Sequence, residues 1–165
     1  MIERLKSAWL AFCHPELLDV KDPLTGALTP REFRRLAKRI INRSQKGGEL
    51  LSLVFIDSDG LKKINDTKGH PAGDVFLKKL AEAIFANIRP FDICSRRHGD
   101  GCDEFILLLP GADLIAAKKV AERINQSFTQ FSWGATTLES KDVLENMVAR
   151  AEKEMYKQKV QKSSL

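Results

Sequence analysis

The segment that decides the fold is 96–105, RRHGDGCDEF, which is followed directly by the apolar run ILLLP at 106–110. Its two glycines suit a turn between two extended segments, because Gly tolerates positive φ and lets other groups approach the backbone. Asp103 and Glu104 begin a strand whose apolar remainder should hold both carboxylates rigidly. Such carboxylates suit a hard cation such as Mg²⁺ together with phosphates. A plain β-hairpin with acidic turn residues is the alternative.

A second acidic cluster follows another apolar segment, LVFI at 53–56. Asp57 and Asp59 come directly after it, and Gly60 then supplies a turn. Two carboxylates at the C-terminal end of a strand form a common acidic corner for a metal. For Asp59 and Glu104, two roles stay open: each ligates the metal or only holds a neighbouring side chain.

Apolar periodicity predicts the remaining elements. Strands are expected at 50–57, 92–97, 103–109 and 131–138, and helices from 30 to about 46–48 and at 72–88, 113–128 and 142–159. From residue 50 the order β-α-β-β-α-β-α is that of the ferredoxin-like split βαβ fold. We therefore expect an α+β domain with a palm-like, antiparallel-rich sheet flanked by helices, and with extra N- and C-terminal helices. In this topology Asp57 and Asp103 should converge.

The N-terminal part predicts two further features. Residues 29–32, TPRE, have the pattern of a capping box with Pro30 at the first helical position, and this helix should bury Phe33, Leu36, Ala37 and Ile40. Residues 2–12 carry an apolar stripe at helical spacing, which needs a partner such as the domain or a second copy. A membrane-surface helix is the alternative. We divide the chain into an N-terminal helix and linker, 1–20, and one domain, 21–165.

Composition restricts the setting rather than the reaction. The chain has 165 residues and three scattered cysteines. This odd set without a C-x-x-C pair favours a reducing, cytoplasmic environment. No apolar run has membrane-spanning length, so no membrane span is expected. The net charge of +5 suits a polyanionic ligand. A nucleic-acid partner is not expected, because the strands lack the aromatic side chains of RNA-binding ferredoxin-like sheets.

Four ordered motifs resemble the diguanylate cyclase (GGDEF-type) family: DPLTG at 22–26, D-x-D-x-LKKIND at 57–66, GH-x-x-GD at 69–74 and GCDEF at 101–105. The resemblance implies an enzyme that joins two GTP molecules into cyclic di-GMP and releases pyrophosphate. It also implies Mg²⁺ or Mn²⁺ as cofactor, a homodimer during catalysis and inhibition by the product. The alternative is a degenerate module that binds GTP or cyclic di-GMP without turnover.

The resemblance assigns roles to individual residues. The metal ligands would be Asp57, the Ser58 carbonyl and Asp103, and the catalytic residues would be Asp103 as proton acceptor, Lys62 and Glu104. Substrate would be bound by Asn65, His70, Asp74 and Lys159, and inhibitory product by Arg89, Asp92 and Arg123. Ordinary alternatives are surface charge for the lysines, helix caps for Asn65 and Asp74, a structural turn residue for His70, and an exposed ion pair for Arg89 and Asp92.

Several residues depart from the family pattern. Cys102 replaces a Gly of the signature, and His98-Gly99-Asp100 lengthen the hairpin tip. Lys162-Ser163 replace the Gly-Arg that usually follows the C-terminal Lys, which predicts a weaker phosphate grip. A zinc site at His98, Asp100, Cys102 and Asp103 matches known ligand spacings poorly.

Overall fold

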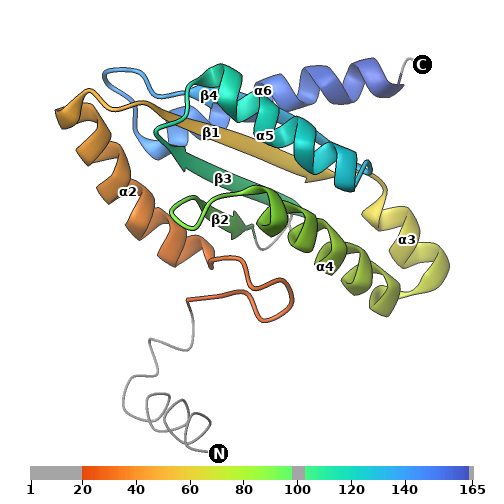
Figure 1. Cartoon of the computed structure of the whole chain (residues 1–165). Helices are drawn as coiled ribbons and strands as arrows, with labels where there is room; N and C mark the ends of the chain where they lie inside the picture. The colour runs from red at the N-terminus through yellow and green to blue at the C-terminus, as the bar shows by residue number, and fades with distance from the viewer. Residues whose placement is uncertain (1–19, 98–102, 164–165) are drawn as a thin grey trace, which may run out of the picture.

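The computed structural model describes residues 20–97 and 103–163. In the order of Figure 1, its elements are α2 (Pro30–Gly47), β1 (Leu51–Ser58), α3 (Leu61–Lys68), α4 (His70–Asn87), β2 (Ile93–Arg96), β3 (Glu104–Pro110), α5 (Leu114–Ser127), β4 (Phe131–Thr137) and α6 (Leu144–Ser163). The predicted strands agree with these bounds to within one residue, and the predicted helices to within four. The helix predicted at 2–12 lies outside the described residues.

The described strands form one antiparallel sheet in the order β2-β3-β1-β4 (Figure 1). β1 pairs with β3 from Leu51 opposite Pro110 to Asp57 opposite Glu104, and it pairs with β4 on its other side. This is the strand order of the split βαβ fold, so the predicted fold class is confirmed.

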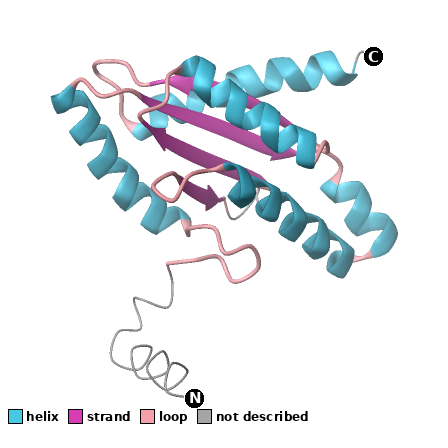
Figure 2. Cartoon of the chain, in the orientation of Figure 1, coloured by secondary structure: helices cyan, strands magenta, loops and turns pink. Residues whose placement is uncertain are grey.

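Helices cover both faces of the sheet (Figure 2). On one face α4 and α5 pack against a core that includes Val54 and Ile56 of β1. On the other face α2 and α6 pack against Leu53 and Phe55. β1 is buried along its whole length, which explains why it reads as a nearly continuous apolar run rather than an alternating one. No described helix is long and apolar enough to cross a membrane.

The predicted capping box is wrong. Thr29 is the N-cap of α2, but its side chain makes no capping hydrogen bond. In a capping box the Glu32 side chain would accept a hydrogen bond from the Thr29 N–H. That N–H instead donates to the Val20 carbonyl at 3.0 Å. Glu32 binds the Arg35 guanidinium, with 2.8 Å between Oε2 and Nε. Phe33 and Ala37 of α2 are buried as predicted, and Ile40 is partly buried and packs against the same core. Leu36 is only partly buried, and the buried Ile41 was not predicted.

The short helix α3 was not predicted. Of its eight residues only Leu61 is buried, so its sequence has no apolar stripe from which a helix could be recognised. It nevertheless matters, because it carries Asn65 and leads through Gly69 into α4. Gly69 has φ of +80°, a conformation that favours glycine.

The DPLTG motif at 22–26 forms a turn that is hydrogen-bonded to the sheet. Asp22 accepts hydrogen bonds from the Thr25 N–H at 2.9 Å and from Arg96 Nη1 of β2 at 3.2 Å. Gly26 has φ of +75°. The Leu28 N–H donates to the Cys94 carbonyl at 2.8 Å, so the chain before α2 lies along the outer edge of β2.

Helix α6 lies in direct contact with β4. A Cβ on Gly134 would come within 2.1 Å of the Ala151 carbonyl oxygen and 2.2 Å of the Met155 nitrogen, so only Gly permits this approach. Side chains of α6 bind backbone groups of β4: Gln158 accepts from the Trp133 N–H at 2.7 Å, and Arg150 Nη2 donates to the Thr137 carbonyl at 2.9 Å. This packing brings the C-terminal end of α6 to the acidic corner.

Candidate active site

Asp57 and Asp103 converge as predicted, although they belong to different parts of the chain. Asp57 is the penultimate residue of β1, and Asp103 directly precedes β3. Ser58 connects them: its N–H donates to the Asp103 carbonyl and its Oγ to Asp103 Oδ2, each at 3.2 Å. The register that pairs Asp57 with Glu104 produces this arrangement.

Two lysines of α6 reach the acidic corner. Lys159 Nζ donates a hydrogen bond to Asp57 Oδ2. Lys162 Nζ lies 3.3 Å from Asp59 Oδ2 and also donates to the Phe131 carbonyl. Asp59 accepts in addition from Ser132 Oγ at 3.0 Å. Sequence reasoning treated Lys162 only as a departure from the family; its position three residues after Lys159, on the same side of a helix, was the available signal.

Burial dominates the electrostatics of the carboxylates. Burial raises the pKa of Asp57, although the hydrogen bond and charge of Lys159 act in the opposite direction. Burial alone would lower the pKa of Lys159, but its bond to Asp57 raises it overall. The two pKa shifts are compatible because the Asp57 side chain, at 12% exposed, is more deeply buried than that of Lys159, at 40% exposed. Burying the carboxylate therefore costs more than burying the ammonium.

Glu104 belongs to the same corner but is held by an arginine. Its Oε2 lies 2.8 Å from Arg97 Nη1, although this contact is not aligned as a hydrogen bond. Burial raises the pKa of Glu104, and the Arg97 charge partly opposes this. The buried Oε2 of Glu104 can therefore accept a further hydrogen bond or bind a cation.

A cavity of about 500 Å³ opens beside these groups. Its walls are formed by Asp57, Glu104, Glu152, Met155, Tyr156, Lys159 and Val160. Among residues 20–97 and 103–163, no three His, Cys, Asp or Glu side chains are clustered so as to hold a metal by themselves. Two carboxylates and a backbone carbonyl suit an ion such as Mg²⁺, which takes its remaining ligands from substrate phosphates and water.

Asn65 and Asp74 come together where α3 meets α4. A Cβ on Gly73 would lie 1.9 Å from Asn65 Oδ1, so Asn65 packs directly on the α4 backbone beside Asp74. Asn65 Oδ1 is buried and accepts no hydrogen bond from the described residues. Asp74 is exposed. A buried amide oxygen without a partner is uncommon in folded proteins and is compatible with a ligand site.

Two other predicted substrate or catalytic residues are exposed. Lys62 lies in the first turn of α3, shortly after the acidic corner. His70 is the first residue of α4; the turn in which it was expected is formed by Gly69 instead. Neither side chain makes a hydrogen bond or ion pair with another described residue, so their assigned roles stay predictions.

The predicted product-binding residues also come together. The Arg89 N–H donates to Asp92 Oδ2 at 2.7 Å, and Arg123 Nη2 donates to the Asn87 carbonyl at 2.9 Å. Burial raises the pKa of Asp92, against the charges of both arginines. Asp92 directly precedes β2, at the end of the sheet opposite Asp57. The residues predicted at the hairpin tip and as a zinc alternative, His98, Asp100 and Cys102, lie outside the described residues.

Comparisons with known proteins agree with this geometry. The family model described as "Diguanylate cyclase, GGDEF domain" matches residues 20–164. Diguanylate cyclase DosC of Escherichia coli (strain K12) is 40% identical over 103 residues, which cover 62% of this chain and 22% of DosC. Response regulator PleD of Caulobacter vibrioides is 37% identical over 111 residues, covering 67% of this chain and 24% of PleD. The chain thus spans about a quarter of the length of these relatives.

Solved structures show the same fold. Diguanylate cyclase SiaD of Pseudomonas aeruginosa, in complex with its activator SiaC, gives a TM-score of 0.80 at 28% identity, covering 97% of this chain and 66% of that one. The GGDEF domain of DgcB from Caulobacter crescentus, in complex with c-di-GMP, gives 0.79 at 22% identity, covering 85% and 90%. At that identity the second likeness concerns the fold alone. With its family match extending over residues 20–164, the chain belongs to the diguanylate cyclase GGDEF-domain family.

Proposed function

We propose that this domain is an active diguanylate cyclase that condenses two GTP molecules into cyclic di-GMP in the cytoplasm. The observation that carries the proposal is the junction of Asp57 and Asp103 through Ser58, facing Lys159 at the edge of a cavity. A degenerate binding module has no need to keep this set of acids and lysines together. The odd cysteine count, with Cys94 buried and unpaired, is consistent with a reducing compartment.

In this proposal the reaction divides among the residues of the corner. Asp57, the Ser58 carbonyl and Asp103 would hold Mg²⁺ or Mn²⁺, which polarises the α-phosphate and acidifies the attacking hydroxyl. The 3′-oxygen of one GTP forms a bond to the α-phosphorus of the other, and pyrophosphate leaves. Asp103 accepts the hydroxyl proton. Because each GTP attacks the other, two copies with one GTP each must face one another.

The cationic side chains would stabilise the phosphates. Lys159 and Lys162 stand on consecutive turns of α6 beside the corner, and Lys62 extends from the start of α3. Cations aimed at the charge that develops in the transition state lower the barrier. Glu104, held by Arg97, would assist as a second acid. Asn65 and Asp74 would read guanine, since a carboxylate accepts from N1–H and N2–H₂ and an amide donates to N3 or O6; His70 would shape this pocket.

Product would bind at Arg89, Asp92 and Arg123 and inhibit turnover. Two guanidiniums suit bidentate contacts to the phosphates of cyclic di-GMP. This cluster forms independently of the acidic corner, which favours the second candidate function, namely a module that binds cyclic di-GMP without making it.

A turnover assay separates the two candidates. The chain, fused to a dimerising coiled coil, is incubated with GTP and Mg²⁺, and the products are separated by chromatography. Cyclic di-GMP and pyrophosphate in a one-to-two ratio are expected. If calorimetry detects cyclic di-GMP binding while no product forms with Mg²⁺ or Mn²⁺, the enzyme proposal is wrong and the binding module is correct.

A further inference from the structure

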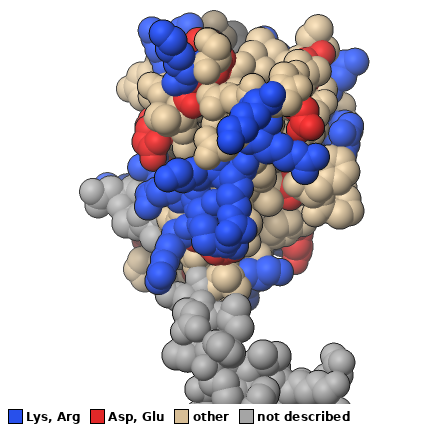
Figure 3. All heavy atoms as spheres, turned by 90° about the vertical axis from the view of Figure 1, so that its left-hand side faces the viewer, with Lys and Arg blue, Asp and Glu red and all other residues tan. Residues whose placement is uncertain are grey.

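The positive charge of the chain is concentrated on one helix. Helix α2 carries seven basic residues and one acid, a charge of +6, whereas the whole chain carries +5, so everything outside α2 sums to −1. The seven residues are all exposed: Arg31, Arg34, Arg35, Lys38, Arg39, Arg43 and Lys46. We call them the α2 basic face. Figure 3 shows Lys and Arg side chains gathered across this side of the molecule.

Most of this charge is not neutralised by neighbouring acids. Arg35 is paired with Glu32, and Arg43 lies 3.7 Å from Glu49. Between described residues, no other member of the α2 basic face takes part in an ion pair. Burial of the opposite side of α2 against the sheet fixes the helix, so the charges form a preorganised strip. Such a strip attracts polyanions and repels other cations.

Exposed apolar side chains lie at the end of the sheet where α2 ends. The register places the starts of β1 and β2 and the ends of β3 and β4 together. Four large apolar side chains at this end are more than half exposed: Leu50, Phe91 and Val143 in the connections and Ile115 in the first turn of α5. Gln45 of α2 joins the basic face to this end, because its Nε2 donates to the Asp142 carbonyl at 2.9 Å. Asp57 stands at the opposite end of β1.

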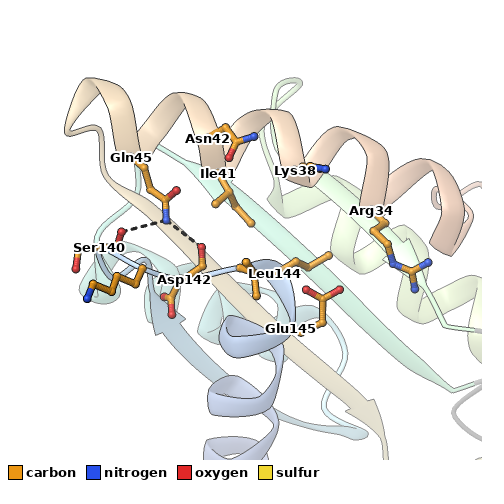
Figure 4. Close-up of a pocket in the computed structure, with 11 residues that line it drawn as sticks. Arg34, Lys38, Ile41, Asn42, Gln45, Ser140, Asp142, Leu144 and Glu145 are labelled. Atoms are coloured by element: carbon orange, nitrogen blue, oxygen red, sulfur yellow. Dashed lines mark hydrogen bonds between the residues drawn. The ribbon is translucent and has the colours of Figure 1, made fainter.

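A cavity of about 500 Å³ lies where these two features meet, between α2 and the start of α6. Figure 4 shows Arg34 and Lys38 extending from α2 on one side, and Leu144 and Glu145 of α6 on the other. Ile41 and Leu144 supply apolar surface to the cavity, and Glu145 is its unpaired acid among the described neighbours. The cavity thus combines the basic side chains Arg34 and Lys38 with apolar surface, which suits a ligand that has a phosphate joined to an apolar group.

We propose that the α2 basic face and the adjoining apolar end bind the surface of an anionic phospholipid bilayer. Basic residues on a surface are attracted to anionic headgroups, and exposed aliphatic side chains enter the interface. Nucleic acid fits less well, because single strands stack on aromatic side chains and the α2 basic face contains none. The binding would leave the acidic corner at the end of the sheet that faces away from the bilayer.

Vesicle flotation of the full chain, without nucleotide, tests the proposal. Vesicles of phosphatidylcholine alone are compared with vesicles in which about one lipid in three is phosphatidylglycerol. We expect binding to the anionic vesicles only, and weaker binding when salt rises from about 0.02 M to about 0.5 M. Equal binding to both vesicle types, or none to either, overturns the proposal. Cyclase activity plays no part in this readout, so its failure and that of the proposed function are distinguishable.

Matched charge reversals locate the surface. K38E with R39E should weaken vesicle binding at least about 30-fold, since two attractive residues become repulsive. K78E with K79E makes the same change in net charge on the exposed side of α4 and should change binding less than about threefold. An equal loss of vesicle binding in both double variants would contradict the assignment to α2. Circular dichroism is the control that both double variants are folded.

Two further arms complete the test. Leu50→Ser with Val143→Ser should weaken binding roughly tenfold, because it removes the apolar contribution; unchanged binding would overturn the role of the apolar end. Fluorescence anisotropy with duplex DNA gives the competing outcome. Tighter binding to DNA than to anionic vesicles, lost in K38E with R39E, would overturn the lipid assignment.

Discussion

Lys159 and Asp57 are 102 residues apart in the chain, yet the lysine Nζ donates a hydrogen bond to the carboxylate Oδ2. The contact joins the last helix to the end of the central strand. It places a cation against a nearly buried acid, where a metal and a triphosphate are proposed to bind. The pair therefore links the packing of α6 to the chemistry of the corner.

We expect Asp57→Ala and Asp103→Ala each to reduce Mg²⁺-dependent GTP turnover by roughly a thousandfold or more, because each removes a proposed metal ligand. Circular dichroism should show an unchanged fold. Asp113→Ala, which removes an exposed cap of α5 far from the corner, serves as the control and should keep full turnover. Full activity in either corner variant would remove that residue from the metal site.

The junction of α3 and α4 predicts a preference for GTP over ATP. Calorimetry should show that Asn65→Ala and Asp74→Ala reduce it, since a polar mismatch leaves buried groups unpaired. Gly73→Ala should act in the same way without touching either residue, because its Cβ would displace Asn65. Equal binding of ATP and GTP by the native protein would refute the guanine assignment.

A pH-dependent contribution to stability is expected from Asp142 and Arg150. The Arg150 guanidinium holds the pKa of Asp142 below its ordinary value of 3.8, against the effect of burial. A carboxylate whose pKa is lowered by folding stabilises the protein fully when the pH is above its pKa in the unfolded chain. The contribution is lost as the pH falls through its pKa in the folded protein. Arg150→Met should therefore lower the free energy of unfolding by about 2–4 kcal/mol at neutral pH.

Urea denaturation at several pH values measures this effect. The difference between native protein and Arg150→Met should shrink as the pH falls below about 4. Lys157→Met, which removes the partner of the exposed Glu154, should change stability by less than about 1 kcal/mol. A difference that stays constant with pH would mean that Arg150 acts through packing or through its bonds to β4.

Product binding should depend on Arg89 and Arg123. Arg89→Ala is expected to weaken cyclic di-GMP binding about tenfold or more, because charge-assisted contacts to phosphate are lost. This corresponds to a loss of about 1.5 kcal/mol or more in binding free energy. Arg31→Ala on α2 is the control. Unchanged binding in Arg89→Ala would place the product elsewhere.

The signature residue Cys102 should lower turnover without abolishing it. Asp103 directly precedes β3 and is held by its hydrogen bonds with Ser58, so we expect the proposed metal ligand to keep its position with a Cys beside it in the sequence. Cyclic di-GMP formation is compared among the native protein, Cys102→Gly and a variant lacking residues 98–100. If the native protein and Cys102→Gly both make none as enforced dimers, the binding module is the correct function.

The sequence predicted the sheet and the acidic corner well, because both depend on strong local signals. The apolar run before Asp57 and the strand after Asp103 set the order of the strands, and that order brings the two acids together. Helix α3 escaped prediction because only Leu61 is buried. The capping box failed because a partner distant from the pattern, Val20, accepts the Thr29 N–H. Lys162 escaped because its contact with Asp59 depends on how closely α6 approaches β4.

The bonds that Gln158, Lys162 and Arg150 make to the backbone of β4 have a consequence for how two copies can meet. An open edge strand invites pairing with another chain. Here the Trp133 N–H and the carbonyls of Phe131 and Thr137 are already bonded to side chains of α6. Two copies cannot join their sheets across β4 without first detaching this helix. Truncating α6 before residue 150 would therefore expose both the edge of β4 and the core that Ala151 and Met155 cover, and we expect such a protein to aggregate.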